Sequence, residues 1–152
     1  MRKAFLISVI LLCGALSAYA QSTVYVFYSP KCWEPAPIKI NGKEAFRLNG
    51  TVKVKFLSTN YSYSASKKKC TLYSEGKTIF SFEMSRSKGS TGIVYKYADE
   101  VQLTLSENSV HYIKITPQRG TDYAFVEIDE KEGLKLLKNK KYVLTPEYIE
   151  ER

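Results

Sequence analysis

The sequence has few of the residues that mark disordered, fibrous or metal-binding proteins. Only 8 of its 152 residues are glycine and 5 are proline, which argues against a long disordered segment and a collagen-like repeat. It has a single histidine, His111, and its scattered acidic residues offer no metal-ligand spacing, so we expect neither a metal nor another cofactor. Its 44% hydrophobic and 25% charged residues are typical of one globular domain.

Long apolar runs are scarce as well, and the one prominent run lies at the N-terminus. A positively charged start, a short apolar core and a group of small residues follow one another at positions 2–3, 5–12 and 18–20. The core is too short for a membrane span, which needs about 20 residues, and this order is typical of a secretory signal peptide. We therefore predict that residues 1–20 are cleaved and that residues 21–152 form a single periplasmic or secreted domain without a transmembrane span.

Two other fates of the N-terminus stay open. Cys13 follows three aliphatic residues, as in bacterial lipoproteins, but lipoprotein processing requires a small residue before the cysteine and Leu12 is not small. This disfavours a lipoprotein anchored through Cys13. An uncleaved N-terminal anchor is the remaining alternative.

Cleavage of the signal peptide would remove Cys13 and leave an even number of cysteines. Cys32 and Cys70 are then the only two thiols, in a compartment that permits disulfides, so we predict that they pair. Closing the loop between them would stabilise the fold by about 4 kcal/mol on the chain-entropy description. The alternative is two buried thiols that act as small hydrophobic residues.

The dominant pattern of the remaining chain is alternation of apolar and polar residues, which predicts β-strands with one buried face. Representative alternating residues are Val52, Val54 and Phe56; Val101, Leu103 and Leu105; Ile113 and Ile115; Ala124, Val126 and Ile128. Asn41-Gly42 and Asn49-Gly50 are typical of tight hairpin turns because both residues accept positive φ. We therefore expect an all-β fold, an antiparallel β-sandwich.

One helix is predicted, around residues 129–140. Asp129 can cap it, with Glu132 three residues later, and Leu134 and Leu137 share one face. Gly133 weakens this helix by about 1 kcal/mol. Thr145-Pro146 can begin one further helical turn near the C-terminus.

A recognisable order of strands and turns runs through segments 23–28, 40–43, 48–50, 101–105, 111–115 and 127–130 with 133–134. Together these segments resemble an uncharacterised family of bacterial secreted domains with a prealbumin-like or PEGA-like β-sandwich. The resemblance spans roughly residues 22–138 and departs near residues 58–61, where such domains usually carry a Pro-Gly turn. It implies a fold and an extracytoplasmic location, and it carries no known activity or catalytic residue.

Positive charge is the first candidate for function. Lys+Arg total 23 against 15 Asp+Glu, and cleavage of Arg2 and Lys3 lowers the net charge from +8 to +6. The basic clusters are Lys67, Lys68 and Lys69, and Lys138, Lys140 and Lys141. A secreted domain meets little nucleic acid, so these clusters favour an anionic envelope polymer or a membrane surface as partner. The alternative is an ordinary solvated face.

Tyrosine pairs are the second candidate. Tyr61 with Tyr63, and Tyr95 with Tyr97, stand two residues apart, so the members of each pair share one face of a strand. If exposed, such pairs can stack on sugars or anchor a protein partner. Core and cross-strand packing is the alternative.

An enzyme is not expected. A Ser-His-Asp hydrolase would have to use His111, but this residue shares a strand face with Ile113 and Ile115, which favours a histidine at the rim of the core. No nucleophile-elbow pattern accompanies the serines. The sequence therefore favours a non-enzymatic interaction or accessory domain of the cell envelope that binds an unknown protein or envelope polymer. A glycan- or anionic-polymer-binding module is the alternative, a hydrolase using His111 is a remote one, and the oligomeric state is left open.

Overall fold

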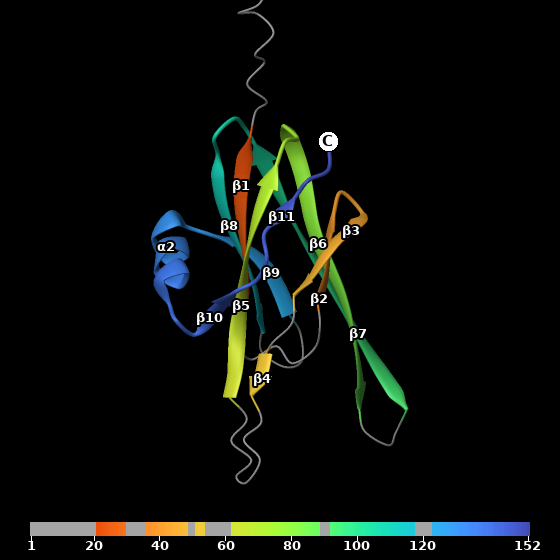
Figure 1. Ribbon diagram of the computed structural model, residues 1–152. Coiled ribbons are helices and arrows are strands. Elements are labelled where there is room, and N and C mark those ends of the chain that lie inside the picture. The colour runs from red at the N-terminus through yellow and green to blue at the C-terminus, as the bar shows by residue number, and fades with distance from the viewer. Residues whose placement is uncertain (1–20, 30–35, 49–50, 54–61, 89–91, 118–122) are drawn as a thin grey trace, which may run out of the picture.

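A computed structural model shows a β-sandwich of two sheets with one helix packed on its outer side (Figure 1). It describes residues 21–29, 36–48, 51–53, 62–88, 92–117 and 123–152. The predicted all-β fold with a short C-terminal helix is confirmed. The predicted signal peptide, residues 1–20, lies outside the described residues. Within the described part, no helix is long and apolar enough to cross a membrane.

The first sheet has the strand order β10-β5-β1-β8-β9, and the short strands β4 and β11 also pair with β5. Its strands are β1 (Ser22–Tyr28), β4 (Thr51–Lys53), β5 (Ser62–Leu72), β8 (Val110–Pro117), β9 (Tyr123–Ile128), β10 (Tyr142–Leu144) and β11 (Tyr148–Ile149). The pairings of β1 with β5 and of β8 with β9 are antiparallel, whereas β1 and β8 run parallel.

The second sheet has the order β3-β2-β6-β7 and is wholly antiparallel. Its strands are β2 (Ala36–Ile40), β3 (Lys43–Leu48), β6 (Gly76–Lys88) and β7 (Ile93–Leu105). Asn41 and Gly42 form the turn between β2 and β3 with φ values of 49° and 82°, which confirms the predicted hairpin. The second predicted turn, Asn49-Gly50, lies outside the described residues.

The main core lies between the two sheets. Alternate residues of β1 and β8, such as Val24, Val26, Ile113 and Ile115, face it and are fully buried. This is the period-two pattern of the sequence, in which every second side chain points to the same face of the sheet. Phe80 of β6 closes the core from the second sheet.

Helix α2 (Glu130–Lys138) covers the opposite face of the first sheet (Figure 1). Asp129 caps it as predicted, because its Oδ1 accepts a hydrogen bond of 2.7 Å from the backbone N–H of Glu132. Leu136 is buried against Phe27 and Tyr112 of the sheet. A Cβ at Gly133 would lie 2.3 Å from ring atoms of Tyr112, so this glycine allows the helix to approach the strand closely.

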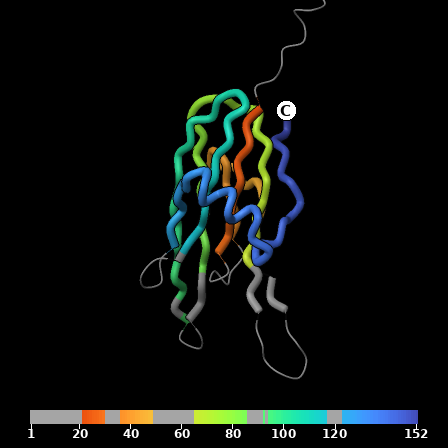
Figure 2. The backbone as a smooth tube through the Cα atoms, turned by 90° about the vertical axis from the view of Figure 1, so that its left-hand side faces the viewer, coloured from red at the N-terminus to blue at the C-terminus, as the bar shows by residue number. Residues whose placement is uncertain are grey.

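The residues after α2 differ from the prediction. Thr145-Pro146 begins no helical turn, and the segment instead forms β10 and β11, which both pair with β5 in parallel. Figure 2 shows this segment running along one side of the sandwich to the C-terminus. These two strands have only three and two residues, which is too short for a clear alternating pattern in the sequence.

Cys70 is fully buried in the main core and forms no disulfide with another described residue. It lies on β5, where neighbouring strands cover both edges. Burial raises the pKa of its thiol, so the thiol stays protonated and poorly reactive at neutral pH. Cys32 lies outside the described residues, and its pairing with Cys70 after export stays a prediction.

Replacing Gly133 with alanine should destabilise the protein although alanine is the better helix former. The new methyl group must displace Tyr112 or lift the helix, and overpacking of this kind costs about 1–3 kcal/mol against a gain of about 1 kcal/mol in helix propensity. The melting temperature measures the effect. Leu134→Ala, at an exposed position of the same helix, is the control and should change stability little. An unchanged melting temperature in Gly133→Ala would contradict the close packing.

Candidate functional site

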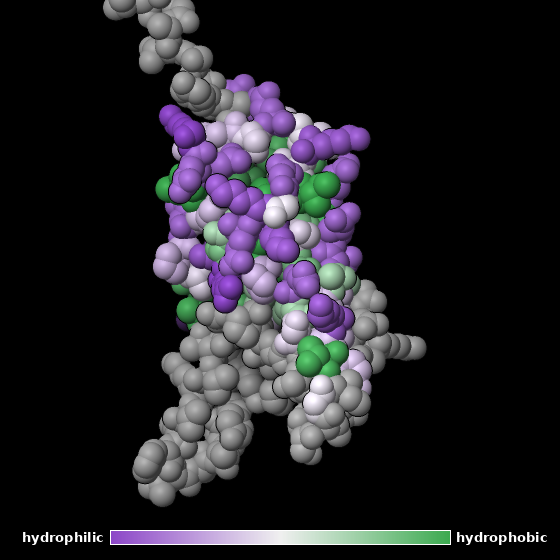
Figure 3. Space-filling view, turned by 90° about the vertical axis from the view of Figure 1, so that its right-hand side faces the viewer, coloured by the Kyte–Doolittle hydropathy of each residue, from purple (hydrophilic) through white to green (hydrophobic). Residues whose placement is uncertain are grey.

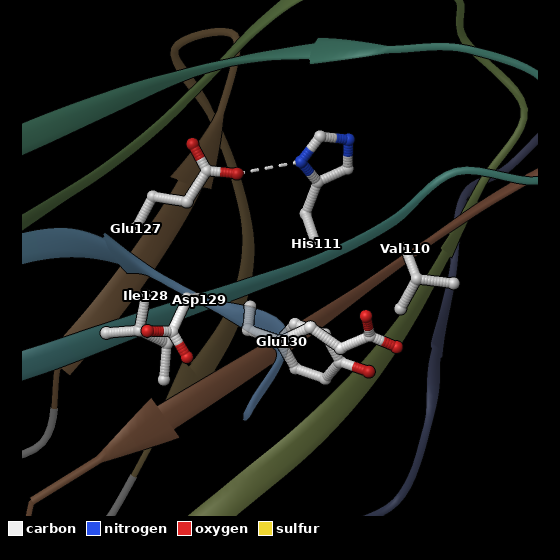
Figure 4. Close-up of a pocket in the computed structure, with 7 residues that line it drawn as sticks. Val110, His111, Glu127, Ile128, Asp129 and Glu130 are labelled. Carbon is white, nitrogen blue, oxygen red and sulfur yellow. Dashed lines mark hydrogen bonds and ion pairs between the residues drawn. The ribbon is translucent and has the colours of Figure 1, made fainter. Parts of the chain in front are cut away.

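An open pocket of about 690 Å³ lies where β9 ends and the chain turns into α2. The ladder between β8 and β9 stops at the pair Tyr112–Ile128, so β8 continues beyond its neighbour. Figure 4 shows His111 and Glu127 pointing toward each other on one side of this pocket, with Asp129 and Glu130 below them. The pocket therefore combines the only histidine of the chain with three carboxylates.

His111 is held by Glu127. Its Nδ1 lies 2.9 Å from Oε1 of Glu127, and the imidazole is 17% exposed against 47% for the carboxylate. Its Nε2 is buried and has no hydrogen-bond partner among the described residues. His111 shares the inner sheet face with the buried Ile113, which agrees with the predicted position at the rim of the core.

The arrangement lacks a catalytic constellation within the described part of the chain. A general base must reach the proton of a nucleophile, at about 2.6–3.2 Å between heavy atoms. No hydroxyl or thiol of a described residue donates to Nε2 of His111. The described residues also contain no group of three or more histidine, cysteine, aspartate or glutamate side chains that could hold a metal ion.

The predicted basic cluster is used inside the molecule. Lys67 Nζ donates to the carbonyl oxygen of Leu137 at the C-terminal end of α2, at 2.5 Å. Lys68 Nζ donates to the carbonyl oxygen of Pro146, also at 2.5 Å, and Lys69 forms an ion pair of 3.0 Å with Glu147. Lys68 and Lys69 thus hold the segment that follows α2 against β5, and Lys67 binds the last turn of α2 itself. The cluster 67–69, expected as a candidate contact for a partner or as a solvated face, is engaged inside the molecule.

Lys68 is the most buried of the three, at 8% exposure. Its ammonium group lies 5.2 Å from the ring centroid of Phe46 in β3, and the Phe46 ring in turn contacts the Tyr148 ring of β11 at 5.4 Å. Burial lowers the pKa of Lys68. Lys68 therefore lies at the side of the sandwich where β5 of one sheet approaches β3 of the other.

A signal for this arrangement was present in the sequence. Consecutive residues of a strand point to opposite faces, so Lys67 and Lys69 must point away from Lys68 once they lie in one strand. The acceptors on the C-terminal segment, such as Glu147, could not be foreseen because 76 to 78 residues separate them from their partners on β5. Glu150 adds to the attachment, since its Oε2 accepts hydrogen bonds from the backbone N–H groups of Tyr73 and Ser74.

The four tyrosines of the predicted pairs differ in their exposure and in whether the structure describes them. Tyr97 is 7% exposed and packs edge-on against Tyr123, with ring centroids 5.3 Å apart, so it belongs to the core. Tyr95 is 36% exposed. Tyr63 lies in β5 but its side chain is outside the described part, and Tyr61 lies outside the described residues altogether.

Tyr95 is exposed because β6 and β7 extend beyond the strand β2 that pairs with β6. Strand β2 pairs with β6 only between Phe80 and Phe82, whereas β6 and β7 stay paired as far as Lys88 and Ile93. The far half of this hairpin extends away from the sandwich (Figure 1). Val94, next to Tyr95, is 56% exposed.

The outer face of the second sheet is hydrophilic over most of its area, as Figure 3 shows. It carries an exposed ion pair between Lys39 and Glu83, at 3.8 Å. At the border of the two sheets, Oδ2 of Asp99 in β7 accepts a hydrogen bond of 2.8 Å from the backbone N–H of Phe125 in β9. This contact occupies a donor on the free edge of β9 and ties the two sheets together.

No protein-family model, no curated protein and no solved structure matches this chain.

The attachment of the C-terminal segment should weaken in acid. Hydrogen bonds from Thr71 and Lys69 lower the pKa of Glu147, so this carboxylate stabilises the fold above its unfolded-state pKa, near 4.5, and the contribution is lost as the pH falls through the lower folded-state pKa. Glu147→Gln should therefore lower the melting temperature at neutral pH and lose part of the acid dependence. The exposed Glu151→Gln is the control and should keep the wild-type profile. Parallel profiles for wild type and Glu147→Gln would show that the ion pair adds nothing.

Proposed function

We propose that this protein acts outside the cytoplasm as a non-enzymatic binding domain of the cell envelope, and that the outer half of the β6–β7 hairpin is its binding element. The observation that carries the proposal is the exposure of Val94 and Tyr95, 56% and 36%, on a hairpin that outgrows its sheet. Val94 and Tyr95 are consecutive in β7, so each exposes its side chain on a different face of the hairpin. Tyrosine is a common anchor in protein interfaces because it combines apolar area with a polar tip.

The polar groups of the molecule support a binding role over a catalytic one. Lys67, Lys68 and Lys69 hold the end of α2 and the segment that follows it, and His111 is engaged by Glu127. The hydrolase alternative would need a hydroxyl group to approach Nε2 of His111. It predicts a turnover activity that disappears in His111→Ala while the fold stays intact, and we propose that no such activity exists.

The proposed extracytoplasmic location and the resemblance to a family of secreted domains are both argued from the sequence. The charged, apolar and small residues at positions 2–20 favour export, and the order of strands and turns resembles uncharacterised bacterial secreted domains with a prealbumin-like sandwich. The two-sheet architecture is compatible with that resemblance. We therefore propose a periplasmic or secreted protein.

Binding of an anionic polymer or glycan is the second candidate function. Its candidate contact residues are the second basic cluster, because Lys67, Lys68 and Lys69 are engaged inside the molecule. Lys138, Lys140 and Lys141 are exposed and form no side-chain hydrogen bond or ion pair within the described part of the chain. Exposed charges of this kind act over about 8 Å at physiological ionic strength, so binding through them should be weak and sensitive to salt.

Photo-crosslinking tests the binding element. A photoreactive amino acid in place of Tyr95, in the protein exported by its host, should give a discrete adduct with an envelope component. The same group in place of Gln102, which is exposed on β7 inside the body of the sheet, is the matched control and should give none. Equal adducts at both positions, or none at Tyr95, would contradict the proposal.

The exported protein should begin at Gln21. The Ala-Tyr-Ala sequence at positions 18–20 is the cleavage signal, and intact mass measured on protein from the secreting host identifies the new N-terminus. A lipid-modified chain that begins at Cys13, or a full-length chain, would overturn this part of the proposal.

A further inference from the structure

We propose that the outer edge of β10 and β11 is a self-association surface, on which a second copy of this chain adds its own C-terminal segment in antiparallel orientation. The surface consists of Leu144, Ile149 and Val143 with the charged residues that flank them, and it lies on the opposite side of the first sheet from β9. It is separate from the β6–β7 hairpin, so the inference does not depend on the proposed function.

The hydrogen bonds to β5 show which backbone groups of the segment remain available. The N–H of Thr145 donates to the carbonyl oxygen of Lys67, and the N–H of Glu150 donates to that of Thr71, both at 2.9 Å. The backbone groups of successive residues in a strand point to opposite edges, so those of Leu144 and Ile149 point outward. No other strand of the described residues pairs with this edge.

The same residues leave about half or more of their apolar surface exposed to solvent. Leu144 is 64% exposed, Ile149 57% and Val143 46%. Unpaired backbone groups beside exposed apolar side chains make an edge strand a template for another strand. Natural edges are usually protected by charge, proline or a covering element, and β9 is protected in this way by Asp99.

The charges decide in favour of a second copy in antiparallel orientation. Lys138, Lys140 and Lys141 precede the apolar strand, whereas Glu147, Glu150 and Glu151 follow it and outnumber Arg152. Glu147 and Glu150 also bind groups of the same chain and keep their negative charge there, and Glu151 is exposed. Two segments side by side in antiparallel orientation bring the basic flank of each copy against the acidic flank of the other. A parallel arrangement would place like charges together.

The geometry therefore fits a two-fold dimer in which one patch meets its own copy. The Leu144 residues of the two chains lie opposite each other at the centre and exchange two N–H···O bonds, as in the hydrogen-bonded pair of an antiparallel ladder. Pro146 limits the length of the ladder because it has no N–H group. The resulting interface is small, so we expect weak, concentration-dependent association.

Sedimentation velocity of the exported chain at about 10 µM to about 1 mM covers the range expected for a weak complex. Leu144→Pro removes the outward N–H and the apolar side chain, and it leaves the pairing with β5 possible because that N–H does not face β5. This variant should raise the dimer dissociation constant by about tenfold or more. Val110→Ser removes an exposed valine, 50% exposed, from β8 and is the control that should leave the constant unchanged. A melting temperature like that of the wild type confirms that each variant is folded.

Charge variants test the orientation without touching β10. Lys140→Glu with Lys141→Glu makes both flanks acidic, and Glu151→Lys makes the acidic flank more basic; each variant alone should associate less than the wild type. A mixture of the two should associate more strongly than either alone, because opposite charges then meet at both ends. The mixture tests the role of charge in either orientation, whereas the loss in each variant alone tests the antiparallel one, since a parallel pair already places like charges together. A wild-type chain that stays monomeric at about 1 mM, or variants that associate like the wild type, would overturn the proposal.

Discussion

The attachment of the C-terminal segment to β5 is the contact on which the closed sandwich depends. Without this segment, strand β5 would expose the part of its edge that β4 does not cover, beside the main core. The segment after α2 covers most of that edge. Lys68 and Lys69 hold it through the carbonyl oxygen of Pro146 and the carboxylate of Glu147, and Lys67 binds the carbonyl oxygen of Leu137 at the end of α2. The run of lysines is thus an element of tertiary structure, and its ammonium groups are engaged within the molecule.

Lys68 shows how this attachment joins the two sheets. Its stem leaves β5 of the first sheet, and its ammonium group lies near the Phe46 ring of the second sheet and on the carbonyl oxygen of Pro146. A buried ammonium group is stable only with partners that replace its hydration, and the carbonyl oxygen and the aromatic face supply them. The C-terminal segment consequently helps to close the side of the sandwich, together with Tyr148.

The two edges of the first sheet are covered to different extents, and this determines where the molecule can bind another strand. One free donor of β9 is occupied by Asp99, and the outer edge of β5 is covered by β4, β10 and β11. Besides the scattered Val110, Val126 and Leu134, the exposed large apolar residues of the described chain lie at two places, the far half of the β6–β7 hairpin and the outer edge of β10 and β11. The hairpin exposes side chains for contact with a binding partner. The edge of β10 and β11 exposes backbone N–H and C=O groups, which suit the addition of another strand.

Local rules of the chain were enough to determine much of this molecule. The alternation in Ile113 and Ile115, the Asn41-Gly42 turn and the Asp129 cap depend on residues only a few positions apart, so the two-sheet architecture and the position of α2 were predictable. Only the tertiary structure decided the roles of Lys67 to Lys69, the burial of Tyr97 against the exposure of Tyr95, and the pairing of His111 with Glu127. These depend on which strands become neighbours and where each strand ends. Alternation determines the face of a side chain, but the neighbours that fill the space beyond that face come from distant parts of the chain.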